Sequence, residues 1–238
     1  MKYAFITVIP FLLFACLPNT PFELDPMTPV PVRKSYISLQ DNSGVFLKIG
    51  SAAIIEDRYA ITSRHVMEGS DGMKGYMAGG IEFPVLEVVL SDSLDLALFE
   101  IPSGVGEPVK IGERVSIGDR VFSVGTTNGS TIYEGIVRKT DLIIHHVDVD
   151  LLNPSGRDRK GRPITHGFLC EGDFKKGFSG GPLVNSRGEL VGIIQGYITE
   201  LLSYGDGTEL NASGTYGTAY HITDIMDEIK RLRREMVK

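Results

Sequence analysis

The sequence of 238 residues contains no tryptophan, only two cysteines and no internal repeat. It also lacks a GxGxxG fingerprint and a Walker-type phosphate loop. The formal net charge of -6 argues against a nucleic-acid partner. The remaining composition is ordinary for a globular protein, with 42% hydrophobic and 23% charged residues, so we do not expect a disordered chain.

The N-terminal apolar run, from Tyr3 to Ala15, is too short to span a bilayer comfortably. It follows Lys2 and is interrupted only by Thr7 and Pro10. A positive start followed by a short apolar run is typical of a secretory signal peptide. We therefore predict that residues 1–15 are a signal peptide and that the protein is exported.

The apolar run ends in Leu-Phe-Ala-Cys, with Cys16 in the last position. This resembles a bacterial lipobox, in which cleavage occurs before the cysteine and lipid is attached to it. We predict that Cys16 is lipidated and anchors the protein to a membrane of the bacterial cell envelope, in the periplasm or on the outer surface. The alternative is a plain signal peptide that happens to contain a cysteine.

Residues 17–32 carry five prolines, which fix φ and cannot donate hydrogen bonds to a sheet. We predict that residues 16–34 are an extended tether and that residues 35–238 form the folded domain. If Cys16 is acylated, Cys170 is the only remaining thiol and no intrachain disulfide can form. Stability would then come from the hydrophobic core, and we interpret Cys170 as a buried small hydrophobic residue.

From residue 35 onward, short runs rich in Val, Ile and aromatic residues alternate with turn residues. Many short strands with close turns favour a β-barrel or a β-sandwich. One long helix is predicted, over residues 222–237, because apolar residues recur there at helical spacing. Its acidic residues lie early and its basic residues late, as the helix dipole favours. We therefore predict an all-β fold with a C-terminal α-helix. The β-type runs lie at 36–39, 44–49, 51–56, 59–62, 82–90, 94–101, 120–124, 131–138, 142–149, 167–170, 182–184, 190–197 and 217–221.

A glycine-rich turn, Gly-Phe-Ser-Gly-Gly-Pro, places Ser179 directly before an apolar run that begins at Leu183. A nucleophilic serine needs an exposed hydroxyl and nearby backbone N–H groups that can bind an oxyanion. Glycine permits the tight turn that aims such N–H groups at one point. Here the donors would be the amides of Gly177 and Ser179.

Two further segments supply a base and an acid. His65 follows the apolar run 59–62, where a rigid strand end can seat the imidazole of a general base. Asp95 directly precedes the apolar run that begins at Leu96, so its carboxylate is well placed for burial beside that imidazole. Asp92 is the alternative acid.

These segments resemble the trypsin-like peptidase superfamily, and most closely its HtrA-type bacterial branch. The order His65, Asp95, Ser179 is that of the family, and the resemblance extends over about residues 44–225. It implies two six-stranded antiparallel β-barrels, over about 35–110 and 111–221, with the catalytic site between them. It also implies that Ser179 attacks a scissile carbonyl while His65 takes its proton.

The chain departs from the family in two places, and a third feature matches the family by position. Phe178 stands where animal digestive members carry an Asp that pairs with a freed N-terminus, so activation by that route is not expected. HtrA proteins usually carry a PDZ domain after the protease, whereas this chain ends about one helix after the last expected strand. A polar segment, residues 153–163, lies where HtrA relatives have a regulatory loop, and a regulatory role for it is a hypothesis from position alone.

The substrate preference is less clear from the sequence. Asp173 lies six residues before Ser179, the spacing at which trypsin-like enzymes place an acid that selects Arg or Lys. An exposed structural Asp is the other interpretation, and small or medium apolar side chains are then equally plausible substrates. The spacing also predicts that Gln195, Gly196 and Tyr197 line a wall of the pocket.

The sequence thus predicts a serine endopeptidase that hydrolyses proteins or peptides through an acyl-enzyme, with no metal or other cofactor. The alternative is a catalytically silent relative that binds peptides or envelope proteins, because a fold alone does not fix a function.

Overall fold

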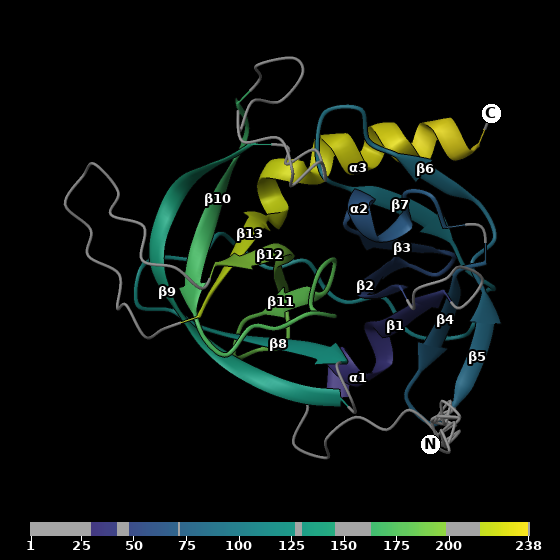
Figure 1. Ribbon diagram of the computed structural model, residues 1–238, viewed down its shortest axis with the longest axis horizontal. Helices are drawn as coiled ribbons and strands as arrows, with labels where there is room; N and C mark the ends of the chain where they lie inside the picture. Colours follow the sequence, from purple (N-terminus) through teal and green to yellow (C-terminus); the bar gives the residue numbers. More distant parts are fainter. Residues whose placement is uncertain are drawn as a thin grey trace, which may run out of the picture.

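The computed structural model describes residues 30–41, 48–70, 72–126, 130–145, 163–198 and 215–237. These residues form two β-sheet halves, with a long helix, α3, running across both (Figure 1). The predicted all-β fold with a C-terminal helix is confirmed. The elements are thirteen strands and three helices in the described part of the chain.

The first half is a seven-stranded antiparallel sheet in the order β5-β4-β1-β2-β3-β7-β6. Its edge strands are joined through the segment between them, since Val85 N–H donates to Met73 O at 3.2 Å and Leu86 N–H donates to Glu100 O at 3.1 Å. The sheet therefore curves toward a barrel without a continuous closing ladder. Its strands are β1 (Tyr36–Asp41), β2 (Lys48–Glu56), β3 (Tyr59–Thr62), β4 (Lys74–Met77), β5 (Ile81–Pro84), β6 (Val88–Leu90) and β7 (Ala97–Glu100).

The second half is a closed barrel of six strands in the order β10-β13-β12-β11-β8-β9. Closure removes the free edges that an open sheet would expose. The six-stranded barrel expected for this half is confirmed. Its strands are β8 (Arg120–Thr126), β9 (Ser130–His145), β10 (Pro163–Glu171), β11 (Pro182–Val184), β12 (Leu190–Ile198) and β13 (Tyr216–His221).

Three helices complete the described structure: α1 (Val30–Ser35), α2 (Arg64–Met67) and α3 (Ile222–Met236). The apolar stripe of α3 is buried through Ile222, Ile225, Ile229 and Leu232. This stripe packs on β12 and β13 of the barrel and on β6 and β7 of the first sheet. The helix therefore ties the two halves together along one side of the molecule, as Figure 1 shows.

The two halves share one hydrophobic core. Its buried residues include Tyr36 and Ile61 of the first sheet together with Val124, Ile193 and Tyr220 of the barrel. Each half also has a core of its own, around Phe99 in the first and around Phe168 in the second. Burial of apolar surface is the main force that holds such layers together, so the shared core fixes how the halves meet.

Several expected boundaries are wrong. The runs 44–49 and 51–56 were expected as two strands, but residues 48–56 form the single strand β2. The run 82–90 was expected as one strand, but Pro84 lacks an N–H and ends β5, so the run is divided between β5 and β6 and the sheet has seven strands instead of six. The runs 131–138 and 142–149 were expected as two strands, but residues 130–145 form the single strand β9.

The predicted tether also extends too far. Residues 30–34 belong to α1, and the side chain of Val32 is only 1% exposed within the shared core. Pro31 stands in the first turn of this helix, where a missing N–H costs nothing. The remainder of the predicted tether, the signal peptide and Cys16 lie outside the described residues, as does the polar segment 153–162.

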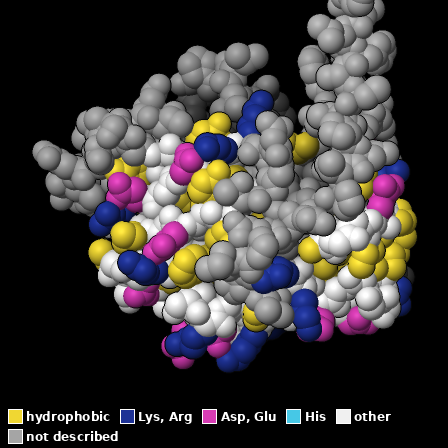
Figure 2. Space-filling model, turned by 90° about the horizontal axis from the view of Figure 1, so that it is seen from below, with side chains coloured by type: hydrophobic (Ala, Val, Ile, Leu, Met, Phe, Trp, Pro, Cys, Tyr) yellow, Lys and Arg dark blue, Asp and Glu magenta, His cyan; other side chains and the backbone are white. Residues whose placement is uncertain are grey.

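Among the described residues, no helix combines the length and the apolarity needed to cross a bilayer. On the face shown in Figure 2, Lys and Arg side chains lie interspersed with Asp and Glu side chains. Ion pairs of this kind include Lys34 with Glu107 and Lys74 with Glu82. Exposed pairs contribute little stability individually, so this surface serves solubility more than folding.

The carboxylate of Glu189 differs from these exposed pairs because three donors surround it. Glu189, which precedes β12, accepts hydrogen bonds from Lys110 at 2.5 Å, Asn185 at 3.0 Å and Arg187 at 2.8 Å. These donors, Lys110 foremost, lower the pKa of Glu189 from 4.5 to about 2. The ionised form is therefore favoured in the folded state, and this stability is present above pH 4.5 and lost as the pH falls toward 2.

We predict that Glu189→Gln lowers the urea midpoint of unfolding at pH 7 and that the difference from wild type shrinks as the pH falls from about 5 to 2. Asp227→Asn is the matched control, since the Asp227 side chain is 97% exposed and pairs with Lys230 alone. Urea titrations over this pH range measure both. A Glu189→Gln effect that is the same at pH 3 and pH 7 would contradict this pH dependence.

Candidate active site

His65 lies in α2, the short helix that follows β3. The strand positions it rigidly, because Thr62 is fully buried and pairs with Ala97 of β7. Arg64 supports the helix from outside by donating to Ser91 O at 2.7 Å and by pairing with Glu68 at 2.9 Å. The His65 side chain is 27% exposed, so its ring remains accessible from one side.

Asp95 binds His65 through both of its carboxylate oxygens. The Nδ1 atom of His65 lies 2.7 Å from Asp95 Oδ2, and the backbone N–H of His65 donates to Oδ1 at 2.9 Å. An ionised carboxylate can only accept, so in the neutral imidazole Nδ1 carries the proton and Nε2 is the acceptor. This is the tautomer that a general base needs.

The Asp95 side chain is 8% exposed, and a buried charge is costly unless hydrogen bonds compensate it. Besides His65, the barrel supplies one bond to the carboxylate and two to the Asp95 backbone. The Gln195 amide donates to Asp95 O at 3.0 Å and to Oδ2 at 3.4 Å, and the Asp95 N–H donates to Tyr220 Oη at 3.3 Å. Burial, reinforced by the charge of Asp95, raises the pKa of the Tyr220 phenol, which therefore stays protonated.

The turn that carries Asp95 is organised by Ser91. Its hydroxyl accepts from the N–H groups of Ser93 at 3.2 Å and Leu94 at 2.9 Å, which is the way a serine stabilises a tight turn. The same hydroxyl donates to Glu228 of α3. Asp92, the alternative acid, lies on the exposed side of this turn, whereas Asp95 is buried. The geometry therefore distinguishes the two carboxylates in favour of Asp95.

Ser179 lies in a tight turn between β10 and β11. Phe178 N–H donates to Lys175 O at 3.3 Å, and Gly177 has a φ of 94°, which together define a type II turn with glycine in the third position. Gly180 has a φ of 79°, and its N–H donates to Ile194 O at 2.7 Å. Both glycines thus hold backbone conformations that other residues rarely adopt.

The turn leaves two backbone donors free. Among the described residues, neither Gly177 N–H nor Ser179 N–H donates to a protein acceptor, although the intervening Phe178 N–H does. These are the two amides that the sequence proposed as oxyanion donors. Ser179 itself is half-buried.

The Ser179 turn is bound to the His65 half of the molecule. Ser51 N–H in β2 donates to Ser179 O at 2.9 Å, and Gly180 packs so closely on Thr62 and Ser63 that a Cβ would lie 1.9 Å from Thr62 Oγ1. These contacts bring Ser179 next to the segment that leads into His65. No hydrogen bond joins Ser179 Oγ to His65 Nε2 in the described structure. Such bonds are often long without substrate, so the geometry remains compatible with a serine–histidine pair.

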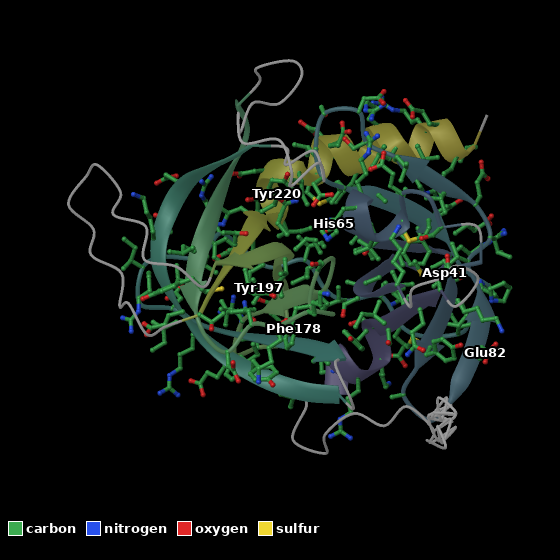
Figure 3. All side chains as sticks on the ribbon, viewed as in Figure 1. Asp41, His65, Glu82, Phe178, Tyr197 and Tyr220 are labelled. Carbon is green, nitrogen blue, oxygen red and sulfur yellow. The ribbon has the colours of Figure 1, made fainter. Side chains whose placement is uncertain are left out.

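Phe178 packs into the barrel. It is 1% exposed, its ring lies 4.9 Å from that of Tyr133 and 5.9 Å from that of Phe174, and a Cβ on Gly125 would lie 2.4 Å from it. Figure 3 shows Phe178 on the barrel side, separate from His65. Apolar packing therefore anchors the turn at the position where the sequence lacks an acid.

The residues predicted to line a substrate pocket separate into two groups. Asp173 is exposed and pairs with Lys175 at 2.7 Å, so its carboxylate is neutralised at the surface. Gln195 is 8% exposed, with its amide turned to Asp95. Tyr197 is 43% exposed, and Gly196 O accepts from Thr218 Oγ1 at 3.3 Å. Asp173 and Tyr197 are therefore exposed, whereas Gln195 is buried against Asp95 and Gly196 is half-buried.

Tyr220 and Thr218 are site residues that the sequence did not single out. Both come from β13, which pairs with β12 in such a register that Gly196 is opposite Thr218 and Ile193 opposite Tyr220. No local motif marks them, because their role depends on strand pairing.

Cys170, as expected, is fully buried, and that burial raises its thiol pKa, so it cannot serve as a nucleophile at neutral pH. In the described part of the chain, no group of His, Cys, Asp and Glu side chains is arranged to hold a metal ion.

A closed six-stranded barrel packed against a second, curved sheet, with an Asp–His pair and a glycine-rich serine turn where the two halves meet, is typical of the trypsin-like class of protein. A family model described as a trypsin-like peptidase domain matches residues 44–193. The chain belongs to this family.

Several known proteases are similar to the chain. Serine endoprotease DegS of Escherichia coli strain K12 is 38% identical over 153 residues, which cover 61% of this chain and 39% of DegS. The active form of the Rv3671c protease of M. tuberculosis superimposes with a TM-score of 0.66 at 20% identity, covering 98% of this chain and 93% of that one. The HtrA-type protease AlgW with a decapeptide gives a TM-score of 0.62 at 19% identity, covering 86% and 66%. The two structures show the shared fold, and the chain spans well under half the length of DegS.

We predict that Gly180→Ala lowers the free energy of unfolding by about 3 kcal/mol, because the new methyl group would overlap Thr62 and Ser51. Gly104→Ala is the matched control, since Gly104 has a φ of 78° and no heavy atom within 4 Å of the position that a Cβ would take. It should cost only about 1 kcal/mol, from the backbone conformation alone. Urea unfolding measures both, and equal losses would show that the contact between the Ser179 turn and β3 is looser than described.

Proposed function

We propose that the protein is a serine endopeptidase with His65, Asp95 and Ser179 as its catalytic triad. The observation that carries this proposal is the pair of hydrogen bonds between Asp95 and His65, together with the packing of the Ser179 turn on Thr62 and Ser63, which lead into His65. Membership of the trypsin-like peptidase family and similarity to DegS support it.

In the proposed reaction, Ser179 Oγ attacks the carbonyl carbon of a peptide bond while His65 Nε2 takes the hydroxyl proton. Asp95 stabilises the imidazolium that forms. The free N–H groups of Gly177 and Ser179 bind the oxyanion of the tetrahedral intermediate. His65 then protonates the leaving amine, and an acyl-enzyme on Ser179 remains. Water, deprotonated by His65, releases the acyl group and regenerates the serine.

The proposal is tested by treating the folded domain, residues 30–238, with a fluorophosphonate probe and measuring intact mass. We expect one adduct on wild type and none on Ser179→Ala. Asp95→Asn should keep the fold but lower kcat for a casein-derived peptide by roughly four orders of magnitude, because it stabilises the wrong histidine tautomer. A wild-type protein that forms no adduct and cuts no peptide, but binds unfolded protein, would instead be a catalytically silent peptide-binding relative.

We propose further that the substrate pocket takes an apolar side chain. Asp173, the one acid at the spacing that selects Arg or Lys, is bound to Lys175 at the surface, and Thr218 is hydrogen-bonded to Gly196 on the neighbouring strand. An uncharged pocket would exclude a basic side chain, which would lose its hydration without gaining a partner.

Asp173→Asn should therefore leave the ratio of kcat/KM for apolar over basic P1 residues unchanged within about twofold. A peptide library that differs only at P1 measures this ratio. Loss of cleavage after Arg or Lys in the variant would show that Asp173 reaches the substrate.

For location, we propose export to the bacterial cell envelope with a lipid anchor on Cys16. The warrant is the N-terminal sequence, which ends its apolar run in a lipobox-like Leu-Phe-Ala-Cys. Expression in a bacterial host with a clickable fatty acid should label wild type and leave Cys16→Ser unlabelled. An equally labelled Cys16→Ser variant would refute this site.

A further inference from the structure

Ser51, in β2 of the first sheet, contacts the Ser179 turn through two hydrogen bonds. Its backbone N–H donates to Ser179 O at 2.9 Å, and its hydroxyl donates to Gly177 O at 2.6 Å. The first bond needs only a backbone, but the second needs a hydroxyl. Ser51 is fully buried, so its hydroxyl has no contact with solvent.

The Ser51 hydroxyl is held in turn by Tyr36. The Tyr36 Oη atom lies 2.7 Å from Ser51 Oγ, and both side chains are fully buried. A serine hydroxyl has one proton, and that proton goes to Gly177 O, which can only accept. Tyr36 must therefore donate to Ser51, and the bonds run in one direction from Tyr36 through Ser51 to the Gly177 carbonyl.

These hydrogen bonds end at the Gly177–Phe178 peptide group, which lies between the Gly177 and Ser179 amides. The Gly177–Phe178 peptide is bound at its carbonyl by Ser51 and at its N–H by Lys175 O at 3.3 Å. The following Phe178 carbonyl accepts from Gly181 N–H at 2.9 Å. Since a peptide group is planar, fixing the Phe178–Ser179 plane sets the direction of the Ser179 N–H. The Gly177 N–H lies in the preceding peptide and is restrained through the two dihedrals of Gly177, which join it to the fixed Gly177–Phe178 plane.

We propose that Ser51, supported by Tyr36, is a positioning residue that holds the oxyanion-binding amides of Gly177 and Ser179 in their productive direction. The buried Phe178 ring, labelled in Figure 3, anchors the same turn from the barrel. The first sheet thereby contributes to the oxyanion site as well as to the histidine and the aspartate. This inference rests on the proposed serine endopeptidase function.

Ser51→Ala removes the hydroxyl and keeps the backbone bond to Ser179. We expect kcat to fall by roughly tenfold to a hundredfold, somewhat less than loss of an oxyanion donor costs, with KM changed by less than about threefold. Tyr36→Phe leaves Ser51 bonded to Gly177 O and should lower kcat by a smaller factor, roughly threefold to tenfold.

The matched control is Ser35→Ala. Ser35 is also fully buried and also donates to a backbone carbonyl, Pro31 O at 2.9 Å, but it has no bond to the Ser179 turn. We expect Ser35→Ala to lose as much stability as Ser51→Ala but to keep the wild-type kcat. A peptide boronate, whose tetrahedral adduct places an oxygen on the oxyanion donors, gives a second measure. Its Kd should weaken in Ser51→Ala by the same factor as kcat/KM and stay near wild type in Ser35→Ala.

The outcomes distinguish the positioning role of Ser51 from the proposed endopeptidase function. If wild type cuts peptides, Ser179→Ala does not, and Ser51→Ala keeps the kcat and boronate affinity of Ser35→Ala, the positioning role is refuted while the endopeptidase function stands. If kcat and boronate affinity fall together in Ser51→Ala alone, the role is supported. A wild-type protein without activity would overturn the endopeptidase function, and the positioning role with it.

Discussion

The buried carboxylate of Asp95 is the constraint around which the rest of the structure is arranged. A charge with so little access to water is tolerated only if hydrogen bonds replace the lost hydration. His65 binds both oxygens, and the Gln195 amide of the barrel donates to Oδ2. The barrel also holds the Asp95 backbone, because Gln195 donates to its carbonyl and Tyr220 Oη accepts from its N–H. Stabilising this charge thus requires groups from both halves of the molecule. The same bonds fix the histidine tautomer, so the requirement for stability and the requirement for base catalysis are met by one arrangement.

The two halves meet a second time at the Ser179 turn, where backbone carbonyls of the turn accept from the backbone N–H and the hydroxyl of Ser51. Ser51 in the first sheet binds the carbonyls of Gly177 and Ser179, while Ile194 in the barrel accepts from Gly180. Gly180 fits against Thr62 and Ser63 because it has no side chain. With α3 packed on strands of both halves, the base and the serine turn are held by one shared core, which gives a site the rigidity that oriented catalytic groups need.

The sequence was sufficient for the parts of the site that are encoded locally. His65, Asp95 and Ser179 each lie beside a recognisable apolar run, and the structure joins His65 directly to Asp95 and links the Ser179 turn to β2 and β3. The sequence could not predict that the Gln195 amide turns to Asp95, or that Tyr220 and Thr218 take part, because strand register decides which side chains meet. The division of 82–90 at Pro84 and the burial of Val32 in α1 were missed for a related reason: a proline marks a break without saying what packs on either side of it.

The most direct test of the proposed catalytic site is a crystal structure of the folded domain after reaction with a small diethyl phosphoryl inhibitor. We predict a covalent bond from phosphorus to Ser179 Oγ, with the phosphoryl oxygen within hydrogen-bonding distance of both Gly177 N–H and Ser179 N–H and with His65 Nε2 beside the adduct. An adduct whose phosphoryl oxygen turns away from these amides, or reaction at another residue, would contradict the proposed site.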